Sequence, residues 1–274
     1  MKIVSAVFLF CLSLALFGED RIPLLISEHH ADHMEFFFRY GYADFNESEK
    51  AAMIVLDAHA DTVINEEIGL IRNHVGVNIS RAVRFTGNHN WIYPIAPCLG
   101  TLAWIGTMRG PPHSGKLEGF LKTTAAWNVP IRTVFTSVEE LRFIEMAEKK
   151  LFISVDLDFF YSGSNGPDDI PLVLDMLFSF SSRWQGPVAW AICLSRPWLP
   201  DDGYAWTLLE RTLHWLDSRP EFLPPKIVLF TSSIVDTSMM AQAYRAESKE
   251  PPALREADTP EHIKTLLQKL ADRN

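Results

Sequence analysis

Short apolar runs alternate with longer amphipathic segments along most of this chain. The short runs are rich in β-branched and aromatic residues and predict strands, whereas the longer segments repeat at the period of a helix. The predicted strands cover residues 22–26, 51–56, 102–105, 131–135, 151–155, 188–192 and 226–230. The predicted helices cover residues 32–40, 137–150, 170–181, 204–216 and 258–272. This alternation predicts a mostly parallel sheet with helices on both faces, which is a three-layer α/β/α fold.

The N-terminus has a different pattern. Lys2 is followed by an uncharged stretch of apolar and small residues from Ile3 to Phe17, and Gly18 then precedes two acidic residues. This order predicts a secretory signal peptide over residues 1–18, since a bilayer span needs about 20 apolar residues. A buried first strand or an uncleaved anchor is the alternative. Residues 19–274 are then expected to form a single domain of an exported protein, periplasmic or secreted.

Composition restricts the partners. The chain of 274 residues has 34 acidic and 25 basic residues, a formal net charge of −9. This acidity disfavours nucleic acid or an anionic membrane as the main partner and leaves a small-molecule substrate as the expected one. No second apolar segment predicts stable membrane insertion after signal removal, and the oligomeric state is left open. Cys98 and Cys193 are expected to be buried thiols rather than a disulfide.

Two acidic strings each follow a predicted strand directly. They are Asp57-Ala-His59-Ala-Asp61 and Asp156-Leu-Asp158. In α/β proteins, chemistry gathers at the carboxyl ends of the strands. Four carboxylates and an imidazole at two such ends would repel one another and resist burial unless a cation held them. The two strings together therefore predict a metal site.

The ligand types indicate the kind of metal. Alternate residues of a chain that leaves a strand can face the same side, so each string can direct its side chains into one cavity. Carboxylates with a minority of imidazole suit a borderline-hard dication such as Mn²⁺ better than they suit structural zinc. A second histidine is expected from Glu28-His29-His30, after the first predicted strand. His33 is expected on the helix surface or behind the ligands.

Five motifs, taken in order, resemble those of a known family. They are Glu28-His29-His30, the string from Asp57 to Asp61, Asn90-Trp91-Ile92, Asp156-Leu-Asp-Phe-Phe160 and Asp202-Gly-Tyr204. The two acidic strings resemble the metal signature of the arginase–deacetylase superfamily. The full series lies within residues 22–206 and resembles uncharacterised protein family 0489, an arginase-like group.

The resemblance implies a centre of two divalent metal ions, manganese first and zinc as the alternative. The implied ligands are His30, Asp57, His59, Asp61, Asp156 and Asp158. Asp57 and Asp156 would bridge the ions. His30 and Asp61 would complete the coordination of one ion. His59 and Asp158 would complete that of the other. His30 is preferred to His29 because it keeps the Glu-x-His spacing of the family, which leaves His29 as a partner behind the ligands.

The reaction that the resemblance implies is hydrolysis of a non-peptide C–N bond by a metal-activated water. A guanidino, amidino or N-acyl amine substrate fits this chemistry, with Asp61 as the catalytic group that accepts a hydrogen bond from the water. Arginine is disfavoured, because the chain lacks the Gly-Gly-Asp-His element of ureohydrolases and aromatic residues replace their acidic continuation after Asp158. The side chains expected to bind substrate are Asn90, Arg196, Asp202 and Tyr204. A loop salt bridge with Asp201 or Asp202 is an equal expectation for Arg196.

Three other interpretations are weighed. One is a deacetylase-like enzyme with a single zinc ion, and another is a secreted binding protein that keeps a vestigial metal site. The third is a phosphate-binding loop at Gly110–Lys116. The loop is disfavoured because Leu117 provides no hydroxyl for Mg²⁺, and Pro111-Pro112 removes two backbone N–H donors.

Overall fold

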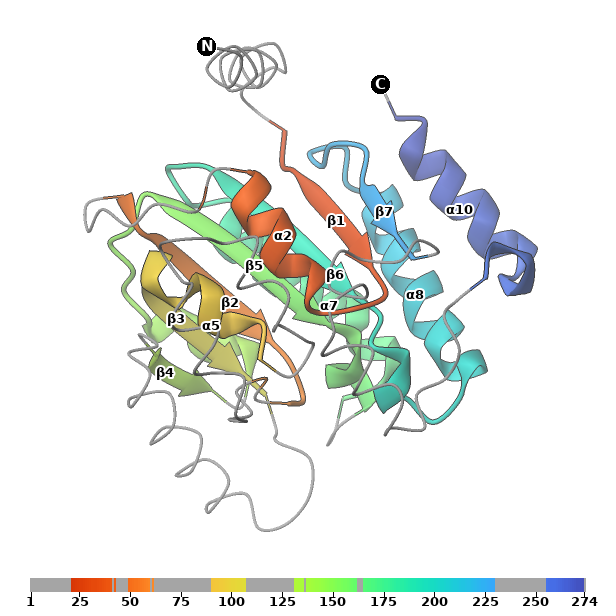
Figure 1. Cartoon of the computed structure of the whole chain (residues 1–274), viewed down its shortest axis with the longest axis horizontal. Coiled ribbons are helices and arrows are strands. Elements are labelled where there is room, and N and C mark those ends of the chain that lie inside the picture. The colour runs from red at the N-terminus through yellow and green to blue at the C-terminus, as the bar shows by residue number, and fades with distance from the viewer. Residues whose placement is uncertain are drawn as a thin grey trace, which may run out of the picture.

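The computed structural model describes residues 21–40, 42, 49–59, 61, 90–106, 131–135, 137–161, 165–229 and 255–273. The predicted signal peptide and the Gly110–Lys116 segment lie outside these residues. The described chain forms a seven-stranded sheet with helices on both faces (Figure 1). This arrangement confirms the α/β fold class predicted from the alternation of strands and helices. Among the described helices, none has the length and apolar character needed to cross a bilayer.

The described strands all pair in parallel. They are β1 (Leu24–Ser27), β2 (Ala51–Leu56), β3 (Leu99–Ile105), β4 (Ile131–Phe135), β5 (Lys150–Asp156), β6 (Val188–Cys193) and β7 (Lys226–Val228). Their order across the sheet is β4-β3-β2-β5-β6-β1-β7. Leu56 lies opposite Val155, and Ser27 lies opposite Cys193. Neighbouring strands therefore end at nearly the same level, and their last residues share one edge of the sheet.

Two helical layers cover the sheet. The helices are α2 (Asp32–Arg39), α5 (Ile92–Ile95), α7 (Ile170–Ser181), α8 (Asp202–Asp217) and α10 (Glu261–Ala271). Short 3₁₀ turns are η3 (Ala96–Cys98), η4 (Val138–Phe143), η5 (Leu157–Tyr161), η6 (Pro167–Asp169), η7 (Arg196–Trp198) and η9 (Glu256–Asp258). Helices α2 and α5 pack on one face of the sheet, and α7 and α8 pack on the other (Figure 1). Helix α10 packs along α8.

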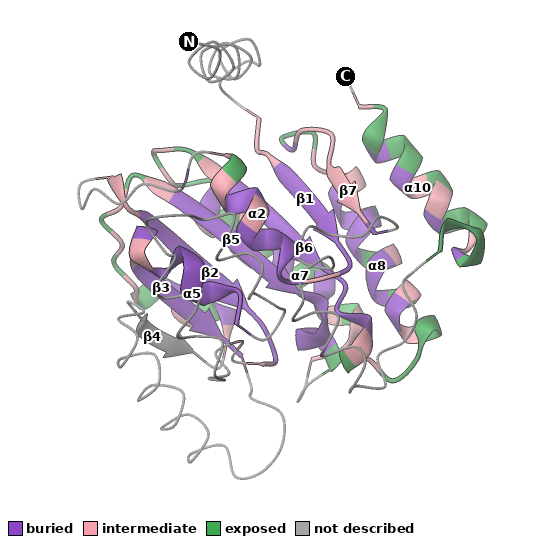
Figure 2. Ribbon diagram, viewed as in Figure 1, coloured by how far each residue is buried: buried purple, intermediate pink, exposed green. Residues whose placement is uncertain are grey.

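Strand β2 shows how an uninterrupted apolar run serves two cores. Ala52, Ile54 and Leu56 join the core under α7 and α8, whereas Met53 and Val55 join the core under α2 and α5. Successive side chains of a strand point to opposite faces, so a strand covered on both sides needs apolar residues throughout. Every residue of β2 is buried, as Figure 2 shows.

The same alternation directs polar side chains of β5 toward α2. Ile153 and Val155 join the core under α7 and α8, and Phe152 joins the core under α2 and α5. Ser154 and Asp156 have the parity of Phe152 and therefore belong to the α2 side of the sheet. A buried serine and a buried aspartate on this side need polar partners. Ser154 finds them after β1, and Asp156 finds them after β1 and after β6.

The helix predicted over 137–150 is wrong. The capping box that suggested it is present at Ser137, but the 3₁₀ turn behind it ends at Phe143 and strand β5 begins at Lys150. Beyond the turn, Ile144 and Met146 pack against the core and alternate with exposed residues. This period of two favours extended chain over helix.

Other predicted elements are found close to their predicted bounds. Helix α7 and strands β2 and β4 have the predicted bounds, whereas β3 begins earlier, at Leu99. Cys98 and Cys193 are buried thiols and form no disulfide, as expected. Cys98 precedes β3 and Cys193 ends β6, so the two thiols lie at opposite edges of a parallel sheet and cannot approach each other.

Candidate metal centre

The six predicted ligands lie at the carboxyl edge of the sheet, around the junction of β2 and β5. The direction in which strands are added reverses here, because β3 and β4 lie on one side of β2 while β5 and β6 lie on the other. Such a switch point opens a crevice between the loops that leave the two strands. Asp57 follows β2 and Asp156 ends β5, so both carboxylates lie where this crevice forms.

His30, Asp57 and Asp156 form the first compact group of metal-ligating atoms. Nδ1 of His30 lies 3.2 Å from Oδ2 of Asp57 and 3.4 Å from Oδ2 of Asp156. All three residues are buried, with exposed fractions of 3 % or less. The turn after β1 returns His30 toward the sheet, where Ser27 donates its hydroxyl to the His29 carbonyl at 3.0 Å.

Asp57, His59 and Asp158 form the second group. Nδ1 of His59 lies 2.6 Å from Oδ2 of Asp158 and 3.9 Å from Oδ1 of Asp57. Asp57 therefore belongs to both groups, and it faces His30 with one oxygen and His59 with the other. One carboxylate with its two oxygens divided in this way has the arrangement of a bridging ligand.

Backbone amides fix the two strings against each other. The amide of His59 donates to Oδ1 of Asp57 at 2.6 Å, and the amide of Ala58 donates to Oδ1 of Asp158 at 3.2 Å. The backbone of the first string thus holds the last carboxylate of the second string. Bonds from amides to carboxylates are charge-assisted and orient the remaining oxygens.

Asp156 is held by a residue that follows β6. Ser195 donates its hydroxyl to Oδ2 of Asp156 at 2.6 Å, and the amide of Asp158 donates to Oδ1 at 3.1 Å. Ser195 has a φ of 48°, in the left-handed region that non-glycine residues seldom adopt. Its amide donates to the carbonyl of Glu28 at 3.1 Å, which ties this strained turn to the segment after β1.

Asp61 lies on the solvent side of the cluster. Its Oδ2 is 2.7 Å from Nδ1 of His30 and accepts the indole N–H of Trp91 at 2.8 Å. Its φ of 45° is also left-handed, a conformation that Asp tolerates better than most residues. Its side chain is 12 % exposed, against 4 % for Asp156 and 0 % for Asp57. Asp61 is therefore the carboxylate of this series that an incoming molecule can reach.

The cluster is electrostatically costly as it stands. Burial raises the pKa of Asp57 well above its usual range, and the charges of Asp61 and Asp158 raise it further. Burial also raises the pKa of Asp156, with added repulsion from Asp158 and Asp57. At His30 burial opposes the charged form, but Asp61, Asp156 and Asp158 together outweigh it and raise the pKa. A cation among these groups would relieve the repulsion.

The donor atoms fit a divalent metal. Two atoms that are each about 2.1 Å from one ion, at about 90–110°, lie about 3–3.5 Å apart, as the donors around His30 do. Nδ1 of His30 and Oδ2 of Asp57 are buried and have no hydrogen bond of acceptable geometry. Such atoms are expensive unless a ligand satisfies them. Each group offers mostly oxygen with one imidazole, which is typical of sites for borderline-hard dications.

The guanidinium of Arg196 forms ion pairs with two carboxylates of the protein. Its Nε donates to Oε1 of Glu28 at 3.0 Å, and its Nη1 donates to Oδ1 of Asp202 at 3.1 Å. The salt bridge with Asp202 was the alternative expectation from the sequence, and the buried partner Glu28 was not foreseen. Asp201 instead caps α8 by accepting the amide of Tyr204 at 2.7 Å.

Tyr204 and Asn90 are the other two residues predicted to bind substrate. The hydroxyl of Tyr204 donates to the carbonyl of Phe160 at 3.0 Å, and its ring lies 5.4 Å from that of Tyr161. Asn90 is buried beside Trp91. None of Asn90, Tyr204, Asp202 and Arg196 belongs to either described metal-ligating group.

The structure places His30, and not His29, among the carboxylates. Nε2 of His29 lies 3.9 Å from Oε2 of Glu28, outside both described groups. His33 is fully buried and packs behind His30, so it takes the second of its two expected positions, behind the ligands and not on the helix surface. Burial and the charge of His30 hold the pKa of His33 well below its usual range.

Three tryptophans contact the two histidines, and the sequence reasoning gave none of them a role. The ring of Trp91 lies 4.5 Å from that of His30, and the ring of Trp198 lies 4.5 Å from that of His59. The indole N–H of Trp104 donates to the carbonyl of His59 at 3.2 Å. Trp198 is 42 % exposed and marks the open side of the cluster. Their positions near strand ends and next to Asn90 were the features of the sequence that could have indicated this role.

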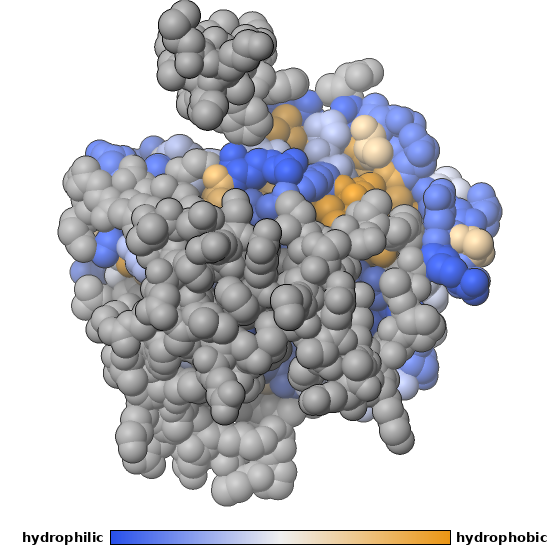
Figure 3. All heavy atoms as spheres, viewed as in Figure 1, coloured by the Kyte–Doolittle hydropathy of each residue, from blue (hydrophilic) through white to orange (hydrophobic). Residues whose placement is uncertain are grey.

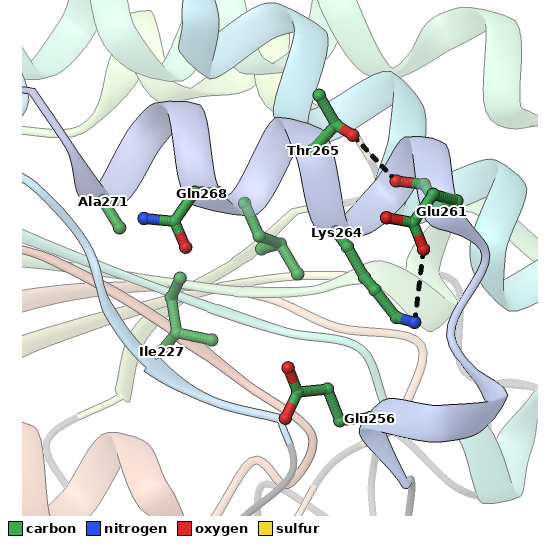
Figure 4. A pocket seen from close by; sticks show the side chains of 8 residues that line it. Ile227, Glu256, Glu261, Lys264, Thr265, Gln268 and Ala271 are labelled. Atoms are coloured by element: carbon green, nitrogen blue, oxygen red, sulfur yellow. Dashed lines mark hydrogen bonds and ion pairs between the residues drawn. The ribbon is translucent and has the colours of Figure 1, made fainter.

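A separate pocket lies between β7 and α10 and has no part in this chemistry. Hydrophobic residues reach the surface over β7, the last strand on that side of the sheet (Figure 3). The pocket there has a volume of about 490 Å³ and contains an ion pair between Lys264 and Glu261 at 3.4 Å (Figure 4). None of the predicted site residues lines it.

Comparisons with known proteins give only remote likenesses, all of them among solved structures. The chain matches no protein family and no curated relative. Among solved structures it is similar to the arginase of Helicobacter pylori, with 16 % identity, a TM-score of 0.42 and 76 % of each chain covered. A likeness this remote carries no functional argument. By its own features, the chain is an α/β protein with a candidate divalent-metal centre at the carboxyl edge of its sheet.

Proposed function

We propose that this protein is a metal-dependent hydrolase of the arginase-like type that cleaves a non-peptide C–N bond in a small molecule. The observation that carries the proposal is the position of Asp57, whose two oxygens face His30 and His59 and so join two ligand groups. We assign guanidino, amidino or N-acyl amine compounds as the substrate class. We also assign two ions, Mn²⁺ before Zn²⁺, and membership of family 0489 from the order of the motifs.

The residues divide the work of such a reaction. Two dications held here would make water a nucleophile at neutral pH and polarise the bond under attack. Asp61, at the exposed edge, would accept a hydrogen bond from the attacking water, and the Trp91 indole N–H orients the carboxylate for this task. Burial of Asp57 and Asp156 keeps bulk water from the inner ligands. The ion pair of Arg196 with Glu28 holds the turn that carries Trp198 beside His59.

Metal counting and a substrate panel test the proposal together. Protein purified without chelator should contain close to two equivalents of Mn²⁺ or Zn²⁺ by mass spectrometry. A panel of guanidino, amidino and N-acyl amine compounds should yield ammonia, urea or free amine with added Mn²⁺. Asp57→Ala should abolish both properties, while Asp175→Ala on the exposed side of α7 should leave both unchanged. Turnover that survives in Asp57→Ala would overturn the proposal.

A single-zinc, deacetylase-like enzyme is the second candidate. The group of Asp57, His59 and Asp158 favours it, because it contains one imidazole and two carboxylates, the set that such an enzyme would need. One equivalent of zinc and retention of activity in His30→Ala would establish this alternative. Metal that binds to wild-type protein with no turnover across the panel, unaffected by Asp61→Ala, would instead favour a binding protein with a vestigial site.

We further propose that residues 1–18 direct export and are removed. The mature protein recovered from cells should then begin near Glu19, as read by mass spectrometry of the intact chain. A chain that still carries Met1, or one recovered from the compartment of synthesis, would contradict this proposal. The metal centre does not depend on the outcome.

A further inference from the structure

We propose that Ser154 and His33 form a buried hydrogen-bond relay that sets the tautomer of His30 and thereby makes Nδ1 its metal-binding atom. The proposal rests on the metal centre proposed above and assigns positioning residues that stand behind it. Ser154 and His33 belong to neither of the described metal-ligating groups. They act through His30.

The distances define a continuous chain of polar atoms. Oγ of Ser154 lies 2.8 Å from Nε2 of His30 and 2.8 Å from Nδ1 of His33. The serine and both histidines are exposed by 1 % or less, so water does not compete for these contacts. The two imidazoles meet edge to face with centroids 4.6 Å apart. Each of the two nitrogens that face Ser154 therefore has a fixed neighbour.

A hydroxyl carries one proton, and this decides the direction of the relay. Nδ1 of His30 faces the carboxylates of Asp57, Asp61 and Asp156, and it must be unprotonated to bind a cation there. The ring proton of neutral His30 then sits on Nε2 and is donated to Ser154. The hydroxyl of Ser154 has accepted that bond and donates its own proton to Nδ1 of His33.

The second histidine completes the logic. Nδ1 of His33 accepts from Ser154 and must be unprotonated, so the ring proton of His33 sits on Nε2. Full burial favours the neutral ring, which retains the acceptor that Ser154 needs. Because Nδ1 of His33 can only accept a hydrogen bond from Ser154, the hydroxyl oxygen of Ser154 is left to accept a hydrogen bond from His30. The tautomer of the ligand is thus set from behind.

The sequence positions explain why the relay can form. Ser154 interrupts an otherwise apolar stretch of β5 and lies on the α2 side of the sheet. His33 belongs to the first turn of α2, three residues after His30, so both rings reach the same strand. A lone serine inside a buried strand is destabilising unless its hydroxyl is satisfied. Its two histidine contacts supply that satisfaction.

Metal affinity tests the relay. Titration of metal-free protein with Mn²⁺ in a calorimeter should show affinity about 10–100-fold weaker for Ser154→Ala than for wild type. Ser181→Ala is the matched control, because Ser181 is also buried but donates to the Phe178 carbonyl within α7. It should bind Mn²⁺ as wild type does. Wild-type affinity in Ser154→Ala would overturn the proposal.

A pair of His33 variants separates the acceptor from mere bulk. His33→Asn places an amide oxygen near the position of Nδ1 and should keep the Mn²⁺ affinity within a few-fold of wild type. His33→Leu fills the space without a hydrogen-bond acceptor and should lose as much Mn²⁺ affinity as Ser154→Ala. Equal loss in both His33 variants would contradict the relay. Thermal unfolding in chelator should show that each variant folds.

Nitrogen NMR reads the tautomers directly. In metal-free protein with labelled histidine, Nε2 should carry a proton in both His30 and His33 while Nδ1 of His33 carries none, and Ser154→Ala should mix the tautomers of His33. A proton on Nδ1 of His33 in wild type would refute the relay without touching the metal centre. Failure of wild type to bind Mn²⁺ would instead refute the proposed function, which this measurement does not depend on.

Discussion

Replacement of Asp57 by Asn removes one charge where the two ligand groups meet, and it should have opposite effects with and without metal. Oδ1 of the new side chain can still accept the amide of His59, a bond of 2.6 Å. Oδ2, which is buried without a hydrogen bond, becomes an amide nitrogen that can donate to nearby carboxylates. The metal-free variant should therefore be more stable than metal-free wild type, although it loses the ability to bind the ions.

The magnitude follows from the cost of a buried charged atom without a partner. Relief of that cost should raise the free energy of unfolding by about 1–3 kcal/mol. For a chain of this size, such a gain corresponds to a rise in Tm of about 2–12 °C. With Mn²⁺ at about 1,000 times its Kd, wild type should gain about 4.1 kcal/mol and overtake the variant, which gains nothing.

The pH dependence has a defined sign. The pKa of Asp57 is raised by burial and by its acidic neighbours, so the group takes up its proton more readily when folded. A carboxyl of this kind destabilises the fold progressively as pH rises from its unfolded pKa, about 3.9, through its folded pKa. The advantage of Asn should thus be small at pH 4 and large at pH 8.

Thermal unfolding in chelator at both pH values measures this directly. Asp217→Asn is the control, because Lys269 and Arg273 pair with that carboxylate and lower its pKa. The control should lower Tm at pH 8, the opposite sign. An Asp57→Asn variant no more stable than wild type in chelator, or one with an equal gain at pH 4, would refute the reasoning.

Three further predictions concern the site and the terminal helix. Because the pKa values of Asp57 and Asp156 are raised and both must be deprotonated to bind metal, Mn²⁺ binding should release protons and weaken from pH 8 to pH 6. Calorimetric titration in buffers of different ionisation enthalpy would measure this release. The pairing that lowers the pKa of Asp217 should stabilise the α8–α10 contact by less than about 1 kcal/mol at pH values above about 3.9. This contribution should be lost as pH falls through the folded pKa, and hydrogen exchange of α10 would show the loss. Trp198→Leu should reduce the fluorescence quenching that Mn²⁺ causes, since the ring of Trp198 lies 4.5 Å from that of His59. Undiminished quenching would contradict the placement of Trp198 at the open side.

Much of the fold was predictable because its strongest elements have clean patterns. The apolar run that forms β2 is buried on both faces, and α7 has a helical period that begins at a proline, so both were predicted at their observed bounds. The segment after Ser137 was not, because a capping box specifies how a helical turn begins and not how far it continues. Its later residues are governed by tertiary packing.

The site was predictable at the level of residues and not of atoms. Asp57 and Asp156 were placed by the rule that chemistry collects at strand ends, and the structure brings them within reach of His30. Which imidazole nitrogen faces the carboxylates depends on χ angles and on Ser154, which no spacing rule reveals. The partners of Arg196 were half predictable, since Asp202 is near in sequence whereas Glu28 arrives from another part of the fold.

The reversal of strand order between β2 and β5 has a consequence for how the protein matures. Donors from the segment after β1, the end of β2 and the end of β5 meet only when both halves of the sheet have docked. A nascent or partly folded chain therefore holds fragments of a coordination sphere and no chelate. An ion bound at this centre would therefore be acquired in the compartment where folding is completed, and the metal supply of that compartment would govern which ion the finished protein carries.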